Sequence, residues 1–187
     1  MIKSTIKKST YKAIYRLLDR VSPLPGDCGK LCGAACCTVE GESEMGIYLL
    51  PGEDKIHDKS DPWLKWTRED AENYEFPDSW KGKVFFVRCT TPPICPREKR
   101  PIQCRTYPLI PHIYADGELD LMYNDALVPY KCPIIEEEMP LEERFVKATF
   151  TVWKRLIKDP LIFDLIRSDS IAREEAALEL QQLLNKE

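Results

Sequence analysis

Four of the eight cysteines of this 187-residue chain lie within ten residues, and this cluster constrains the fold more than any other feature. The four are spaced C-x3-C-x3-C-C and are Cys28, Cys32, Cys36 and Cys37. Thiols so close in sequence compete for the same space in an apolar core. A metal ion, in contrast, needs soft thiolate ligands that converge on one point. The cluster therefore predicts a metal-thiolate protein.

Composition favours a cytoplasmic protein whose thiols stay reduced. With 43% hydrophobic residues, the chain can bury a core without help from disulfides, which are the alternative role for an even number of cysteines. Residues 1–8 contain three lysines and do not resemble a secretory signal. No apolar run approaches the roughly 20 residues of a membrane-spanning helix. The net charge of −4 argues against a nucleic-acid partner.

Helices are expected at both ends of the chain. Residues 5–21 have an amphipathic pattern with a basic polar face, typical of a packing helix or of a helix that binds a membrane or an acidic partner. Helical spacing returns from residue 140 and predicts a helix that breaks at Asp159 and Pro160. A short apolar turn or helix should follow, before Ser168 or Ser170 caps a last helix.

The middle of the chain is expected to be rich in loops, with a few short antiparallel strands. The strand candidates are residues 46–50, 83–88, 109–114 and 118–123. The last two are joined by a short turn and predict a β-hairpin. Three tryptophans between the strands should anchor the core: Trp63, Trp66 and Trp80.

The fold class expected from these patterns is α+β, in a single domain over residues 1–187. Its parts would be an N-terminal amphipathic helix at 1–21, a cysteine-cluster metal-binding core at 27–133 and C-terminal helices at 140–187. The core contains every cysteine of the chain, and the two helical parts flank it.

All eight cysteines are candidate metal ligands. The other four lie further along the chain, and they are Cys89, Cys95, Cys104 and Cys132. Eight thiols allow two four-thiolate sites, or one site with spare thiols. The neighbouring Cys36 and Cys37 should project in diverging directions, so that one of them can serve a different site. Cations near the thiols would favour thiolates and offset their charge, namely Lys30, Arg88, Arg97, Arg105 and Lys131.

An all-sulfur ligand set suits both an iron–sulfur cluster, for example [4Fe–4S], and zinc. Structural zinc sites typically use pairs of cysteines separated by a longer linker, whereas the gaps here come in series. His57 lies apart from the cysteines, and His112 is more typical of a surface or core histidine than of a ligand. We therefore expect an iron–sulfur cluster, with zinc as the alternative.

Two motifs together resemble a known family. Besides the cysteine cluster, residues 100–108 read RPIQCRTYP, which is similar to an RPxxCRxYP or RPxxCRxFP motif. The pair resembles the CxxCxxCC (YkgJ-like) family of zinc- or iron-chelating cysteine-cluster domains over roughly residues 27–133. The gaps here are three residues where the family name implies two. A similar module occurs in flagellin lysine N-methylases, where an iron–sulfur cluster is implicated.

The resemblance implies metal binding and leaves the activity open. It points to Arg105 and Tyr107 as cofactor-binding residues that donate hydrogen bonds to a cluster sulfur or an anion. A redox partner or another protein partner is expected, of unknown identity. The alternatives are a zinc-stabilised interaction module and an iron–sulfur protein-lysine N-methylase. The sequence contains no G-x-G-x-x-G, P-loop, H-E-x-x-H or G-x-S-x-G motif, so no catalytic residue can be nominated.

Overall fold

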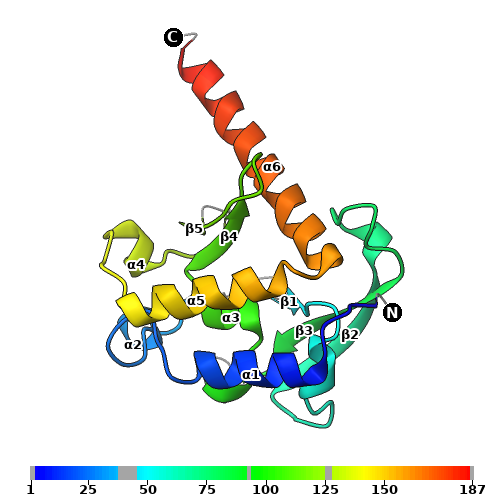
Figure 1. Cartoon of the computed structure of the whole chain (residues 1–187). Helices are drawn as coiled ribbons and strands as arrows, with labels where there is room; N and C mark the ends of the chain where they lie inside the picture. The colour runs from blue at the N-terminus through cyan, green and yellow to red at the C-terminus, as the bar shows by residue number, and fades with distance from the viewer. Residues whose placement is uncertain (1–2, 38–45, 92–93, 125–127, 186–187) are drawn as a thin grey trace.

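The computed structural model describes residues 3–37, 46–91, 94–124 and 128–185 of the chain (Figure 1). It has helices near both ends and a few short antiparallel strands between them, which confirms the α+β fold class. Six short helical segments connect these parts: α2 (Gly29–Cys32), η1 (Glu53–Ile56), η2 (Ala71–Asn73), η3 (Arg97–Lys99), α3 (Ile102–Thr106) and α4 (Pro133–Glu136).

Helix α1 (Lys8–Leu18) is shorter than the 5–21 expected from its pattern, and its buried residues are Tyr11, Ile14, Tyr15 and Leu18. Two tyrosines lie on the buried face. The Tyr11 hydroxyl donates to the Pro51 carbonyl oxygen at 2.9 Å, and the Tyr15 hydroxyl donates to Glu53 Oε1 at 2.7 Å. Because these hydroxyls find partners inside the protein, the amphipathic rings can be buried, and Leu17 is left exposed.

The central strand of the first sheet is β3 (Lys83–Cys89), and its neighbours are β1 (Ile47–Tyr48) and β2 (Leu64–Asp70). All pairs are antiparallel. Strands β1 and β3 were expected, but β2 was not. Strand β2 lies at the edge of the sheet. Its charged residues interrupt the alternation of apolar and polar residues by which a strand is recognised in a sequence.

The predicted hairpin is confirmed as β4 (Leu109–Ile113) and β5 (Leu119–Tyr123). Strand β4 packs against helix α6 (Pro160–Leu184). The Ile113 amide donates to Ser170 Oγ at 2.9 Å, and Arg173 Nη2 donates to the Pro111 carbonyl oxygen at 2.9 Å.

Helix α5 (Glu143–Leu156) ends before Asp159 as expected, but the prediction of a separate last helix is wrong. Helix α6 is continuous from Pro160 and has Asp159 as its N-cap, with Asp159 Oδ1 accepting from the Leu161 amide at 3.1 Å. Proline is favoured in the first turn of a helix, and Pro160 is accordingly the first residue of α6. Ser170 is a buried residue within the helix, and its hydroxyl donates to the Ile166 carbonyl oxygen.

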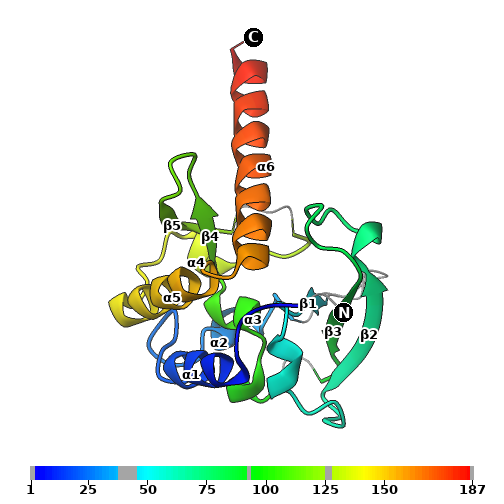
Figure 2. The same ribbon diagram turned by 45° about the vertical axis from the view of Figure 1, so that its right-hand side comes forward.

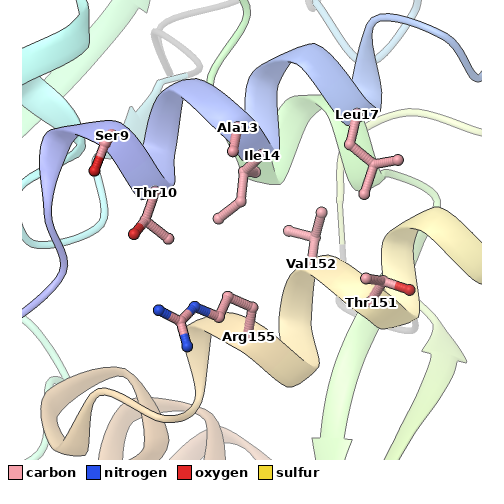
Figure 3. A pocket seen from close by; sticks show the side chains of 8 residues that line it. All are labelled: Ser9, Thr10, Ala13, Ile14, Leu17, Thr151, Val152 and Arg155. Atoms are coloured by element: carbon pink, nitrogen blue, oxygen red, sulfur yellow. The ribbon is translucent and has the colours of Figure 1, made fainter.

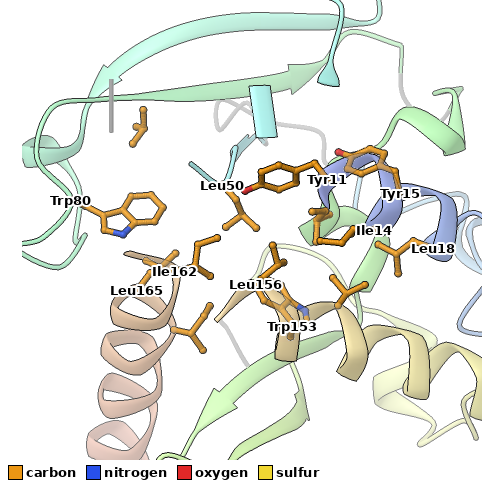
Figure 4. Close-up of a cluster of buried hydrophobic side chains, with 14 of the residues drawn as sticks. Tyr11, Ile14, Tyr15, Leu18, Leu50, Trp80, Trp153, Leu156, Ile162 and Leu165 are labelled. Carbon is orange, nitrogen blue, oxygen red and sulfur yellow. The ribbon is translucent and has the colours of Figure 1, made fainter. Parts of the chain in front are cut away.

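The largest cluster of buried side chains joins α1, α5 and the first half of α6 (Figure 4). Trp80 belongs to this cluster, and its indole N–H donates to the Leu161 carbonyl oxygen at 2.8 Å. Trp63 lies in a second cluster on the three-stranded sheet, against which Trp66, Cys89 and Cys95 are packed. Two of the three tryptophans are therefore buried core residues, and Trp66 lies partly buried beside them.

The fully buried carboxylate of Glu53 connects three parts of the chain. Its two oxygens accept from the Tyr15 hydroxyl of α1 at 2.7 Å, from the Leu50 amide at 3.0 Å and from the Ile102 amide of α3 at 2.8 Å. Burial raises the pKa of Glu53, and the hydrogen bonds counteract this effect. The position of α3 relative to α1 therefore depends on Glu53.

We expect Glu53→Ala to lower the free energy of unfolding by about 2–4 kcal/mol, because three buried donors lose their acceptor. Urea denaturation followed by tryptophan fluorescence measures the change. The exposed Glu72 provides a control, and Glu72→Ala should change the free energy by less than about 0.5 kcal/mol. Equal losses in the two variants would contradict a central role for Glu53.

His57 lies beside this network, with Nε2 at 3.0 Å from the Tyr15 hydroxyl, and burial lowers the pKa of His57 to about 4. Because the folded state resists protonation, His57 should destabilise the protein as the pH falls from about 6.5 to about 4. Over that pH range the free energy of unfolding of the wild type should fall by about 2 kcal/mol more than that of His57→Gln. Urea titrations at several pH values measure the difference. Lys65→Gln on the exposed side of β2 is the control, and a pH-independent difference for His57→Gln would refute the prediction.

Candidate metal centre

The eight cysteines come from four separate segments of the chain, and all are free thiols. The segments are residues 28–37, 89–95, 104 and 132. Cys28 and Cys32 lie at the two ends of α2, and Cys36 and Cys37 follow it. The remaining four come later in the sequence: Cys89 ends β3, Cys95 precedes η3, Cys104 lies in α3 and Cys132 directly precedes α4.

The thiols of Cys36 and Cys37 lie close together, with 3.7 Å between their Sγ atoms. The prediction that they diverge is therefore wrong. It assumed helical geometry, but α2 ends at Gly33, where φ is 61°, and Ala34 also has a positive φ of 57°. These two left-handed residues end the helix, so helical spacing does not continue to the two thiols.

One of this pair is poised to be a thiolate. A hydrogen bond from Cys36 is the largest effect on Cys37 and lowers its pKa to about 7. The same hydrogen bond, with burial, raises the pKa of Cys36. The Arg100 guanidinium also favours the charged form of Cys37, which identifies it as the member of the pair that loses its proton first.

Arg100 is the cation in direct contact with a thiol, since its Nε donates to Cys95 Sγ at 2.9 Å. Desolvation raises the pKa of Cys95, of Cys28 and of Cys104, for which it reaches about 12. In each case the charge of Arg100 acts in the opposite direction. Four thiols, Cys28, Cys37, Cys95 and Cys104, therefore lie within the electrostatic reach of one guanidinium.

The remaining thiols extend this group. The charge of Cys132 acts on the pKa of Cys28, and the charge of Cys89 acts on the pKa of Cys95. The charge of Cys37 likewise raises the pKa of Cys104. Seven thiols from all four segments thus influence one another: Cys28, Cys36, Cys37, Cys89, Cys95, Cys104 and Cys132.

The two predicted cofactor-binding residues occupy different positions. Arg105 is buried and holds α3 against α1: its Nη2 donates to the Tyr15 carbonyl oxygen at 3.1 Å and to Asp19 Oδ1. The buried hydroxyl of Tyr107 has no hydrogen-bond partner among the described residues, and burial is the main cause that raises its pKa. The charge of Cys132 is a further cause, so Tyr107 lies near that thiol. A role for either residue beside a cofactor stays a prediction.

Arg100 begins the RPxxC motif, but its hydrogen bond to a cysteine thiol was not predicted. The signal was therefore in the sequence, five residues after Cys95. What the sequence could not indicate is the fold of the loop through η3, which brings the guanidinium back onto the Cys95 sulfur.

The chemistry of the donor set suits a soft metal or an iron–sulfur cluster, because free thiols are soft ligands and a cation offsets thiolate charge. No three His, Cys, Asp or Glu side chains within the described ranges are arranged as a ready ligand group. His112 contacts Glu174 at 3.2 Å through Nε2 and lies in β4. The described thiols therefore do not form a closed ligand set.

Comparison of the sequence and fold with protein-family models, curated proteins and solved structures finds no match. The resemblance to the cysteine-cluster family consequently stays an expectation that rests on two motifs. The geometry around Arg100 is an independent argument, since it depends on the positions of the thiols and not on a relative.

The proximity of Cys36 and Cys37 predicts tight binding of phenylarsine oxide, whose arsenic bonds to two neighbouring thiols with release of water. Replacing one thiol leaves a single As–S bond, so Cys36→Ser should weaken binding at this pair by roughly tenfold or more. Titration with mass spectrometry and peptide mapping measures the effect. Cys32→Ser is the matched control, and equal binding by Cys36→Ser and wild type would show that the two thiols do not act together.

Proposed function

We propose that this protein binds an iron–sulfur cluster through its cysteines and acts in electron transfer, redox sensing or cluster-dependent chemistry. The observation that carries the proposal is the contact of the Arg100 guanidinium with Cys95 Sγ at 2.9 Å, and the charge of Arg100 also acts to lower the pKa of Cys28, Cys37 and Cys104. The identification of [4Fe–4S] as the cluster type belongs to the same proposal.

A packing role explains the arrangement less well. Cysteines that only fill space are usually deeply buried, whereas none of the eight cysteines here is fully buried. A disulfide role is not supported either, because all eight thiols are free. When several neighbouring thiols are ionised together, a cation among them stabilises the thiolates because it offsets their mutual repulsion.

The residues of the chain would have distinct roles around a bound cluster, which would supply one-electron chemistry. The thiolates would hold it, and the Arg100 N–H at Cys95 would adjust the charge on a ligand sulfur. Tyr107, whose hydroxyl has no partner in the described parts of the chain, could donate near Cys132.

Zinc is the second candidate, because an all-thiol set with a neighbouring cation suits it equally. It would make the protein a zinc-stabilised interaction module rather than a redox protein. The lysine N-methylase alternative rests on the resemblance alone.

Free thiols in this number also favour a reducing compartment, and we propose the cytoplasm. Among the described residues no helix combines the length and the apolar character needed to cross a bilayer. A redox protein or another protein is the partner we propose.

The decisive experiment is an anaerobic preparation with a visible spectrum and with iron, zinc and sulfide measured per chain. We expect broad absorption near about 400 nm, with iron and acid-labile sulfide in equal amounts. Cys37→Ser and Cys104→Ser should lose most of the iron, because both thiols lie at Arg100. Arg100→Gln should retain less iron than Arg100→Lys, which keeps the charge.

The variant Cys32→Ser tests the thiol at the end of α2. If it retains iron, the ligands belong to the other seven cysteines, and if it loses iron, Cys32 is a ligand as the sequence predicted. Stoichiometric zinc without colour would replace the iron–sulfur proposal by the zinc module. A folded protein with neither metal, before and after anaerobic reconstitution, would overturn both.

A further inference from the structure

A shallow groove of about 360 Å³ lies on the surface between α1 and α5 (Figure 3). Its apolar surface is formed by Ala13, Ile14 and Leu17 of α1 and by Val152 of α5. Arg155 lies at one side of it. The groove therefore combines an apolar floor with a charged border, which is the character of a surface that receives an amphipathic helix.

The two helices beside the groove are strongly basic, although the chain as a whole has a net charge of −4. Helix α1 has no acidic residue, and α5 has one, Glu143. Their basic residues are all exposed: Lys8, Lys12 and Arg16 on α1, and Arg144, Lys147, Lys154 and Arg155 on α5. An occupant of the groove should accordingly be acidic on its polar side.

A helix with that chemistry is present in the same chain. Helix α6 contacts the β4 strand up to Arg173 and Glu174, and its last turns extend clear of the rest of the molecule in both views (Figures 1 and 2). Residues 175–184 are all exposed. Helical spacing places five apolar residues of this segment on one stripe: Ala176, Ala177, Leu180, Leu183 and Leu184.

The charged residues of this segment are all acidic, namely Glu175 and Glu179, and the side away from the stripe also contains the exposed Leu178. Leu180, Leu183 and Leu184 expose 60–66% of their surface, which is unusual for three leucines on one stripe. An isolated helix of this length is only marginally stable in water, so packing of its apolar stripe would stabilise it.

We propose that residues 175–184 of one copy dock in the α1–α5 groove of a second copy. The apolar stripe would cover Ala13 and Leu17, and the glutamates would face Arg155 and the other exposed basic residues of α1 and α5. The contact must lie between copies, because the end of α6 and helix α1 lie at opposite ends of the molecule in both views (Figures 1 and 2).

Pairing of two α6 ends with each other is the competing arrangement. It would cover the same leucines, but it would bring the acidic residues of both helices together, and like charges on facing helices destabilise the pair. The groove, in contrast, offers opposite charge. This inference does not depend on the metal, since neither surface contains a cysteine.

Sedimentation and light scattering on the full chain test the proposal. Because one surface binds a different surface of the next copy, we expect the average mass to rise above that of one chain as concentration increases. Association should weaken in high salt, since it depends partly on charge. A wild type that stays monomeric at all concentrations and at low salt would overturn the proposal.

Two sets of substitutions separate the surfaces. Leu180→Glu with Leu183→Glu removes the apolar stripe, and Arg16→Glu with Arg155→Glu reverses the charge at the groove; each pair should weaken self-association by roughly tenfold or more. Leu178→Glu is the matched control, because Leu178 is 57% exposed and lies on the other side of α6. It should associate as wild type does, and a loss equal to that of the stripe variant would contradict a specific contact.

A mixture of the two double variants gives the sharpest result. The stripe variant retains an intact groove, and the groove variant retains an intact α6 end, so together they should form a one-to-one complex although neither associates alone. If the groove variant self-associates as wild type does, α6 pairs with itself or with another surface, and the proposal is wrong. Circular dichroism of each variant establishes that it is folded.

Discussion

The buried carboxylate of Glu53 is the interaction on which the arrangement of the cysteines depends. It accepts hydrogen bonds from α1, from the chain before η1 and from the first residue of α3. Helix α3 holds Cys104, and the charge of Glu53 contributes to the raised pKa of that thiol. A buried acid with three donors is costly to disrupt, so it fixes α3 more firmly than apolar contacts alone would.

The motif at residues 100–108 contains two arginines that make different contacts. Arg105 points from α3 toward α1, where it contacts the Tyr15 carbonyl oxygen, the Tyr15 ring at 4.9 Å and Asp19. Arg100 precedes the helix and points to the thiols instead. Arginine suits both positions, because its planar group donates in several directions and stays charged when it is partly buried. Together they explain why one short segment influences both the core and the candidate metal centre.

Strong local patterns predicted much of the fold, and long-range contacts decided the rest. The periodicity of α5 and the alternation of the β4–β5 hairpin are visible in the sequence, whereas edge strand β2 is masked by its charged residues. All eight cysteines were predicted as candidate ligands from spacing. The contact of Arg100 with Cys95, and the approach of the Cys36 and Cys37 thiols to 3.7 Å, depend on conformations that spacing does not encode.

The different burial of α1 also explains why the molecule has a groove at all. Tyr11 and Tyr15 of α1 occupy the core because their hydroxyls donate to Pro51 and Glu53. Alanine and leucine are thereby left on the outer face, beside Val152 of α5. The hydrogen bonds of Tyr11 and Tyr15 thus leave an apolar surface between the two basic helices α1 and α5. The end of α6, with its leucines and glutamates, is complementary to this surface in polarity and charge.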